Sequence, residues 1–398
     1  MPRVILLTDL SEEYAKKLLK GIVRYAKEHE PWVLCKMPFS YRVEHEVEGV
    51  LDWAKKWKAD GIIAQFYNTD RVGIFRENGI AAIAQDFKSR FTEIPNITGA
   101  HKLAGKMGAD YYVRKGFKHF AFYGFKDIVW SSERCLGFRE ELDRYQLGTR
   151  FYEYRNDDFK DLWYYESAPL IAWLKALPKP VGIMACDDNQ GHHIAEVCKQ
   201  CGLKIPEEIA VLGVDNDEAV CTLSDPPLSS INQAVEKGGY ETARLMTRMI
   251  QNPDGHHEDV IVQPTHVTTR HSTDMYATND KYIATALRYI HQHADRKLTI
   301  DQITRLVPLS RRLLESRFKQ EIGVPIYNYI MNLRIERFAF QLLETSDTII
   351  EIADTSGFSD YKNIARQFKK IKGCTPTEYR MKNVLRNVSP TQGRYLID

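Results

Sequence analysis

The first 270 or so residues alternate short, continuous apolar runs with longer amphipathic stretches, and this rhythm constrains the fold more than any other feature. Runs such as Val4–Thr8 and Val181–Asp187 are strand-like, whereas Glu12–Glu28 repeats apolar residues at helical spacing. Continuous apolar strands separated by helices are typical of parallel sheets that are buried on both faces. We therefore predict an α/β fold for this part.

This number of strands is more than one doubly wound sheet commonly holds, and we predict two α/β lobes with parallel sheets. The predicted strands lie at 4–8, 32–35, 61–66, 80–86, 119–125, 151–154, 181–187, 211–216 and 229–233. The predicted helices lie at 12–28, 47–58, 101–115, 131–145, 161–176, 189–201 and 234–250. From residue 281 onward the chain has only helical patterns, which predicts an all-α second part. The expected division is 1–271 for the two lobes, 272–280 for a linker, 281–385 for the helical domain and 386–398 for a tail.

Composition and sequence patterns indicate the cellular compartment of the protein. With 43% apolar and 27% charged residues, the 398-residue chain resembles ordinary globular proteins of two or three domains. No apolar run reaches the ~18–20 residues of a membrane helix, and the N-terminus lacks the pattern of a signal peptide. Seven cysteines without framework spacing fit free thiols in a reducing compartment. We expect a cytoplasmic protein without membrane contact.

The charge is unevenly distributed along the chain. Residues 281–398 carry 20 Lys and Arg against 12 Asp and Glu, a balance of +8, whereas the first 280 carry 35 against 41, a balance of −6. A basic end on an acidic body suits contact with polyphosphate, although a solvated helical surface has the same signature. Motifs must decide between the two.

Two similar units in the basic part point to DNA. In the first, Thr299 caps a short helix, a turn follows at Pro308–Leu309, and Ser310 caps a second helix that Gly323 ends. In the second, Thr348 and Ser359 are the corresponding caps, Gly357-Phe358 forms the turn and Gly373 ends the helix at Lys372; the long helix 326–344 joins the two units. Two such basic helices fit successive major grooves about 34 Å apart.

The ordered motifs of this segment resemble the AraC/XylS-type DNA-binding domain. They are LS at 309–310, L-x-x-x-F-K at 314–319, Gly323, the pair Arg334 and Ala339, I-x-x-I-A-x-x-x-G-F at 349–358 and F-K-K-x-x-G-x-T-P-x-E-Y-R at 368–380. The alternative is a helical cap or a dimerisation bundle. By the resemblance and the outward helix faces, the expected DNA-contacting residues are Arg311, Arg312, Glu315, Ser316, Lys319, Tyr361, Lys362, Ala365 and Arg366.

The first part resembles the periplasmic-binding-protein-like sensor of LacI-type repressors. The resemblance rests on GIIA (61–64), E-R-x-x-G-F (133–138), ACDDNQG (185–191), LGVDND (212–217) and PPLSSINQ (226–233). LacI-type chains carry their DNA-binding domain before the first strand, whereas here it follows the sensor. The combination resembles regulators of pentose catabolism, and this resemblance implies D-xylose as the effector and activation of xylose-catabolism genes. It also implies a homodimer on promoter DNA that contacts RNA polymerase.

A small polar ligand of such a sensor lies in the cleft at the carboxyl ends of the strands. Each buried sugar hydroxyl needs a partner, because one left unpaired costs about 1–3 kcal/mol. The resemblance places Arg134, Asp187 and Asp215 in the pocket, and we add residues at strand ends or with stacking capacity. The expected sugar-binding set is Asp9, Gln65, Trp130, Arg134, Asp187 and Asp215, with Phe66 as a further stacking candidate. Asp188 is expected to cap the following helix instead. Strand-end Asp residues are also common helix caps and interlobe ion-pair partners.

Rival functions have weaker support. Cys198-x-x-Cys201 beside His192-His193 lacks a second ligand pair at zinc-site spacing, and no phosphate-binding glycine motif is present, so we expect no metal and no cofactor. Adjacent Asp187 and Asp188 diverge from a strand end, which disfavours the paired acids of a glycoside-active enzyme. A sugar-binding module without DNA-binding activity would leave the helical domain unused. A regulator of the same class that responds to another pentose remains the nearest alternative.

Overall fold

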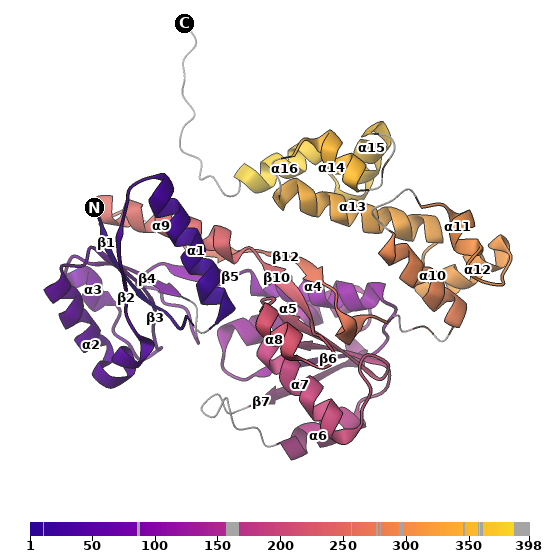
Figure 1. Ribbon diagram of the computed structural model, residues 1–398, viewed down its shortest axis with the longest axis horizontal. Coiled ribbons are helices and arrows are strands. Elements are labelled where there is room, and N and C mark those ends of the chain that lie inside the picture. Colours follow the sequence, from indigo (N-terminus) through magenta and orange to yellow (C-terminus); the bar gives the residue numbers. More distant parts are fainter. Residues whose placement is uncertain are drawn as a thin grey trace, which may run out of the picture. The chain divides into compact units, whose positions relative to one another are not determined.

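The computed structural model describes residues 1–10, 12–85, 88–156, 167–255, 257–275, 278, 280–293, 298–344, 347–356, 358 and 361–385. The chain divides into two compact units (Figure 1). The first comprises Met1–Val113 and Phe117–Asp274, and the second comprises Arg114–Gly116 and Met275–Asp398. Each unit is described by itself.

A six-stranded, all-parallel sheet forms the first lobe, in the order β11-β5-β4-β3-β1-β2. The strands are β1 (Arg3–Leu7), β2 (Val33–Lys36), β3 (Gly61–Gln65), β4 (Ala81–Gln85), β5 (Asn96–Gly99) and β11 (Val260–Val262). The helices are α1 (Glu13–Glu28), α2 (Phe39–Trp57), α3 (Gly73–Glu77) and α9 (Val235–Gln251). One core packs the sheet against α2 and α3, and another packs its opposite face against α1 and α9.

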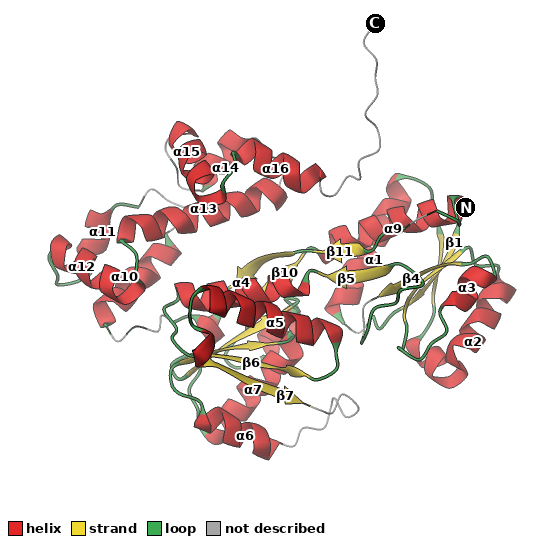
Figure 2. Cartoon of the chain, turned by 180° about the vertical axis from the view of Figure 1, so that it is seen from behind, coloured by secondary structure: helices red, strands yellow, loops and turns green. Residues whose placement is uncertain are grey.

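A second six-stranded sheet forms the other lobe, in the order β12-β10-β9-β8-β6-β7, with only β12 antiparallel to its neighbour. Figure 2 shows strands of both sheets in yellow. Its strands are β6 (Phe120–Phe125), β7 (Phe151–Asn156), β8 (Val181–Ala185), β9 (Ile209–Val214), β10 (Ser229–Gln233) and β12 (Pro264–Thr268). Its helices are α4 (His101–Arg114), α5 (Val129–Arg144), α6 (Ser167–Ala176), α7 (Asp188–Cys201) and α8 (Glu218–Leu223). A short 3-10 turn, Gly148–Arg150, precedes β7.

The described backbone passes between the two sheets three times, after β5, after β10 and between β11 and β12. At the last two crossings the strands run close together, since the N–H of Ala234 donates to the carbonyl of Gln263 at 2.9 Å. The predicted fold class, two parallel-sheet α/β lobes followed by a helical domain, is confirmed.

Several boundaries differ from the prediction. The helix expected at 47–58 starts at Phe39 and breaks at Glu46, where φ is 55° and ψ is −174°. Strands β5, β11 and β12 were not predicted, because β5 and β12 carry polar residues or proline and β11 has only three residues. The helix expected at 161–176 is seen from Ser167, and residues 161–166 lie outside the described residues. The six-residue α8 was also not predicted.

The end of the first unit extends into the predicted linker. A 3-10 turn at His271–Thr273 buries Ser272 completely, and its Oγ donates to the carbonyl of Val211 at 2.7 Å. The same Oγ accepts from the N–H of Ser229 at 2.8 Å. The division between the units falls between Asp274 and Met275, so Ser272 and Thr273 belong to the first unit.

Helices alone make up the second unit as far as it is described. They are α10 (Lys281–Gln292), α11 (Ile300–Thr304), α12 (Arg311–Ile322), α13 (Ile326–Glu344), α14 (Ile349–Thr355), α15 (Tyr361–Lys372) and α16 (Pro376–Leu385). One apolar core joins α10, α11 and α12 to the start of α13, and a second joins the end of α13 to α14, α15 and α16. Helix α13 therefore connects two similar subdomains, as Figure 1 shows in orange and yellow. No described helix of the whole chain is long and apolar enough to cross a membrane.

Candidate functional site

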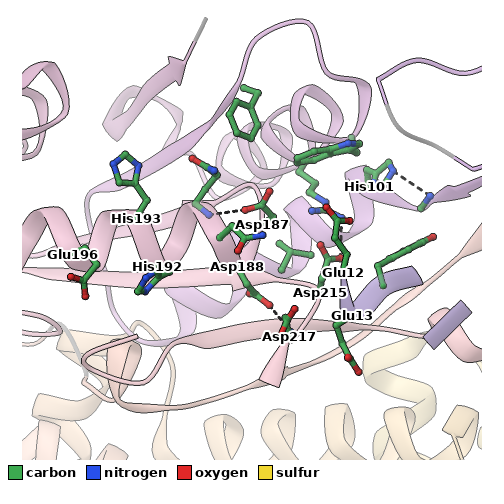
Figure 3. Close-up of a pocket in the computed structure, with 18 of the residues that line it drawn as sticks. Glu12, Glu13, His101, Asp187, Asp188, His192, His193, Glu196, Asp215 and Asp217 are labelled. Atoms are coloured by element: carbon green, nitrogen blue, oxygen red, sulfur yellow. Dashed lines mark hydrogen bonds and ion pairs between the residues drawn. The ribbon is translucent and has the colours of Figure 1, made fainter. Parts of the chain in front are cut away.

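A cavity of about 700 Å³ opens at the carboxyl ends of the strands, between the two lobes of the first unit (Figure 3). Gln65 and Gln85 are the last residues of neighbouring strands β3 and β4, which pair in register at these positions. Asp187 and Asp215 follow β8 and β9 on the other lobe. This is where small ligands bind in open parallel sheets, because the loops after the strands are free to present side chains.

Five of the six predicted sugar-binding residues line this cavity. They are Gln65, Trp130, Arg134, Asp187 and Asp215. Asp9, which follows β1, is not among the described residues that line the cavity. Its backbone N–H donates to Gln65 Oε1 at 3.1 Å. Phe66, a stacking candidate, is instead a core residue, only 2% exposed and packed on Phe75 and Phe91.

Arg134 is the central donor of the cavity wall. It lies on α5 with 3% exposure, its Nη1 donates to the carbonyl of Cys186, and its Nη2 donates to Asp215 Oδ1 at 3.3 Å. The guanidinium carbon lies 5.3 Å from the centroid of the Trp130 ring, within cation–π range. The Nε of Arg134 is buried and has no hydrogen-bond partner in the described structure. The described protein therefore leaves one buried donor of this side chain unsatisfied.

Asp187, and not Asp188, caps the helix that follows β8. Asp187 is the residue that caps α7, accepting from the N–H of Gln190 at 2.7 Å, and it also lines the cavity. Asp188 lies inside the helix with 3% exposure, and it accepts from Ser230 Oγ at 2.5 Å and from the N–H of Asp217 at 2.7 Å. Its expected role as helix cap is thus wrong, because the helix starts one residue earlier than the sequence pattern suggested.

Burial of these carboxyl groups has electrostatic consequences. It raises the pKa of Asp187 to about 6, with the charge of Asp215 adding to the effect, and it raises the pKa of Asp188 well above the usual range. Glu12, at the start of α1, was not predicted and also lines the cavity. Although Glu12 keeps contact with solvent in the open cleft, desolvation by the surrounding walls and the charges of Asp187 and Asp215 raise its pKa to about 7.

The sequence reasoning missed further polar residues of the wall. Gln85 is 3% exposed, and its Oε1 has no partner in the described structure. His101 is 5% exposed and accepts from the N–H of Gly99 through Nε2 at 3.2 Å. Gln85 ends a strand that the sequence did predict, so the strand-end rule that selected Gln65 also applies to it. Glu12 was assigned to a helix, and His101 gives no signal of its own.

The first helix-turn-helix unit has the predicted caps. Thr299 and Gln302 form a capping box at the start of α11, and Ser310 Oγ accepts from the N–H of Leu313 at 3.3 Å. Helix α12 ends at Gly323, whose φ of 84° suits glycine. Leu314 and Phe318 are fully buried. The outer face carries the exposed residues Arg311, Arg312, Ser316 and Lys319 and the half-buried Glu315.

An ion-pair network surrounds the first residue of α12. Arg311 Nη1 lies 3.2 Å from Asp301 Oδ1 of α11, and Arg311 Nε lies 3.3 Å from Glu315 Oε1 one turn along α12. A cation at a helix N-terminus is opposed by the helix dipole. The two carboxylates offset this cost and fix the direction of an exposed guanidinium.

The second unit repeats the pattern. Thr348 and Glu351 form a capping box on α14, and Ile364 and Phe368 of α15 are fully buried. Arg366 is exposed, Ala365 is half-buried, and Tyr361 and Lys362 lie in the first turn of α15. The predicted cap Ser359 and the turn residue Gly357 lie outside the described residues.

The histidines and cysteines near α7 have other partners. His193 Nδ1 shares a hydrogen bond with the hydroxyl of Tyr123 at 2.9 Å, and His192 Nδ1 does so with Ser224 Oγ at 3.0 Å. Cys198 is buried. Among the described residues, no three His, Cys, Asp or Glu side chains gather as a metal site would require.

Comparisons with known proteins agree with both parts. Residues 109–273 match the periplasmic binding protein-like domain family, and residues 303–382 match a helix-turn-helix domain family. The xylose operon regulatory protein of Escherichia coli (strain K12) is 28% identical over 397 residues, covering 95% of this chain and 96% of that protein. Its counterpart in Haemophilus influenzae is 29% identical, covering 95% and 98%.

Solved structures give the same picture. The solved structure of the xylose-binding transcription activator XylR matches with a TM-score of 0.58 and 27% identity, covering 95% of this chain and 97% of that one. The transcriptional regulator CelR in complex with cellobiose matches the fold with a TM-score of 0.55 and 19% identity, over 68% of this chain and 84% of that one. The relatives are regulators and not enzymes, as the sequence predicted. The chain is therefore a DNA-binding transcription regulator in which a periplasmic-binding-protein-like sensor precedes an AraC-type helix-turn-helix domain.

Proposed function

We propose that this regulator senses D-xylose in the cleft of the first unit and activates xylose-catabolism genes through the second unit. The observation that carries the proposal is the cavity at the strand ends, where buried polar atoms of Arg134 and Gln85 stay unpaired. Similarity over nearly the full chain to proteins named for the xylose operon supports the choice of sugar.

The wall of the cavity suits a neutral sugar. Asp187 and Asp215 offer carboxylate acceptors, Arg134 Nε offers a donor, and Gln85 Oε1 offers a second kind of acceptor. Each hydroxyl that loses water must find such a partner, or binding loses about 1–3 kcal/mol. The indole of Trp130, beside Arg134, adds an apolar surface for the carbon face of the ring.

DNA binding is assigned to the outer faces of α12 and α15. The proposed contacts are Arg311, Arg312, Glu315, Ser316 and Lys319 on the first helix and Tyr361, Lys362, Ala365 and Arg366 on the second. Arginine grips guanine edges or phosphate, and Glu315 can accept from cytosine N4. The regulator acts in the cytoplasm as a homodimer and, as an activator, contacts RNA polymerase.

Sugar binding is proposed to shift the two lobes toward a closed arrangement and so change the affinity for DNA. The coupling free energy cannot exceed the difference in the free energy of sugar binding between the two states, and it is typically about 1–3 kcal/mol. Because coupling is reciprocal, promoter DNA must tighten sugar binding by the same factor.

Calorimetry of the full chain with D-xylose, L-arabinose, D-ribose and D-xylulose tests the effector. We expect D-xylose to bind more tightly than the others, and preference for another pentose would replace the proposed effector within the same regulator class. A mobility-shift assay with DNA from the neighbouring promoters tests the output. If no promoter fragment shifts with or without sugar, the proposed role in regulation of these genes is wrong.

A further inference from the structure

Lys17 connects the two lobes beside the cavity. It lies on α1 of the first lobe, and its Nζ donates to the carbonyl of Asp215 at 3.2 Å and to the carbonyl of Asn216 at 3.1 Å. Both carbonyls follow β9 of the second lobe. The ammonium also lies 4.0 Å from Glu13 Oε1 on its own helix. A single side chain thus bonds two successive backbone carbonyls on the other side of the cleft.

The segment that Lys17 holds has an unusual backbone. Asp215 has a φ of 100° and Asn216 a φ of 48°, in the region that residues with side chains rarely adopt. Contacts within the second lobe support the same turn, since the N–H of Asn216 donates to Ser230 Oγ at 3.0 Å and the N–H of Asp217 donates to Asp188 Oδ2 at 2.7 Å. Such a backbone persists only where its surroundings fix it from several sides.

The residue at the centre of this turn also provides a side chain to the cavity. The carboxylate of Asp215 accepts from Arg134 Nη2 and from Gln233 Nε2 and lines the cavity wall. Its carbonyl, held by Lys17, and its carboxylate, held by Arg134, belong to one residue with one constrained φ. Lys17 and Arg134 thus hold the backbone and the side chain of the same residue.

We propose that Lys17 is a positioning residue for effector binding: from the first lobe it holds the turn at Asp215 and Asn216, and so helps to fix the direction in which the Asp215 carboxylate faces the ligand. This role rests on the proposed function, since it requires that the cavity binds the effector. In this proposal, a contact with the backbone across the cleft completes the binding site together with the ligand.

The test compares three variants of the full chain. Lys17→Met removes the donors and keeps the length of the side chain, Lys17→Arg retains donors, and Lys20→Met removes an exposed cation three residues along the same helix. We expect Lys17→Met to weaken D-xylose binding by roughly tenfold, the effect of losing charge-assisted hydrogen bonds. Lys17→Arg should recover most of the affinity, and Lys20→Met should bind as the wild type does. Lys20→Met should also bind DNA without sugar as the wild type does.

Two further measurements separate positioning from general destabilisation. Hydrogen exchange of the ligand-free protein should be faster at the amides of Asn216 and Asp217 in Lys17→Met, and unchanged in Lys20→Met. In an Asp215→Asn background, the loss of affinity caused by Lys17→Met should shrink, because Lys17 acts through that carboxylate. Wild-type affinity in Lys17→Met, or an unchanged loss in the Asp215→Asn background, would overturn the role. If the wild type binds no pentose, the proposed effector is wrong, and unchanged exchange at the turn would then overturn the positioning role by itself.

Discussion

Arg134 Nη2 lies 3.3 Å from Asp215 Oδ1, and this ion pair joins the helix after β6 to the loop after β9 at the wall of the cavity. The guanidinium is 3% exposed and donates to the carbonyl of Cys186 as well. Two of its nitrogens are therefore committed to the protein, and they fix the plane in which the third, Nε, presents its proton.

Replacing Arg134 by Ala should weaken sugar binding by about 1.5–3 kcal/mol, roughly ten- to a hundredfold, because a charged donor is lost. Arg134→Lys should restore little, since an ammonium cannot reproduce the planar fork. Calorimetry with D-xylose measures both effects. DNA binding without sugar should stay near the wild-type value, and an equal loss of sugar and DNA binding would contradict the separation of the two functions.

The raised pKa of Glu12 predicts a pH-dependent stability. Since the folded-state pKa is about 7 and the ordinary value is 4.5, the folded state holds a proton that the unfolded state has lost between these values. The contribution is full below about pH 4.5 and disappears as pH rises through 7. Glu12→Gln should therefore gain in melting temperature relative to the wild type as the pH is raised from 5 to 8.

Asp187, with a pKa raised to about 6, titrates in the same protein over a lower window, so the comparison between pH 6 and 8 isolates Glu12 best. Glu13→Gln is the matched control for the loss of a carboxylate at the start of α1. If it shows the same pH-dependent gain as Glu12→Gln, the effect belongs to charge removal in general and not to Glu12.

The fold followed from sequence periodicity because its signal is repeated in many strands and helices. Apolar runs such as Val4–Leu7 and Val181–Ala185 are buried on both faces and leave a continuous pattern. The short strands β5 and β11 leave none, since four and three residues carry no measurable period. Their place in the sheet comes from the crossings between the lobes, which are a property of the tertiary fold.

Residues of the cavity wall could be predicted from the sequence only where their position relative to a strand was enough to place them. Residues that directly follow an apolar strand, such as Asp187 and Asp215, could be placed at the cleft from the sequence. The choice between Asp187 and Asp188 as helix cap could not, because it depends on where α7 begins, a difference of one residue. Glu12 lines the cavity from the start of α1, several residues beyond the end of β1, so the rule for residues that directly follow a strand did not select it.

Close packing of α4 on α5 should affect sugar binding from a distance. A Cβ at Gly105 would lie 2.0 Å from the carbonyl oxygen of Arg134 and 2.6 Å from the backbone nitrogen of Phe138, so α5 would have to move. We expect Gly105→Ala to destabilise the protein by about 1–3 kcal/mol and to weaken sugar binding, because α5 carries Trp130 and Arg134.

Gly108→Ala, one turn along α4, is the matched control. Its Cβ would meet the sulfur of Met184 at 2.6 Å, and a flexible thioether can move where a backbone cannot. Thermal melting and calorimetry of the two variants should therefore differ, with the smaller losses in Gly108→Ala. Equal losses would show that the backbone contact with α5 has no special role.

Asp301 should determine how selectively α12 binds DNA. Its carboxylate holds Arg311 Nη1 at 3.2 Å, while Glu315 holds Nε at 3.3 Å, so the guanidinium has a preferred direction before DNA arrives. Exposed pairs of this kind contribute about 0.2–1 kcal/mol, which corresponds to a change in affinity of at most about fivefold.

Asp301→Ala removes one of the two carboxylates that hold Arg311, and with it one negative charge near the DNA phosphates. Affinity for unrelated DNA should rise slightly, and the ratio of promoter to unrelated DNA affinity should fall roughly two- to fivefold. Fluorescence anisotropy with both DNAs at two salt concentrations measures the ratio. Arg311→Ala should cost about 1–3 kcal/mol on the promoter, and in that background Asp301→Ala should no longer change the ratio. A ratio unaffected by Asp301→Ala alone would mean that the pair does not orient Arg311 toward the bases.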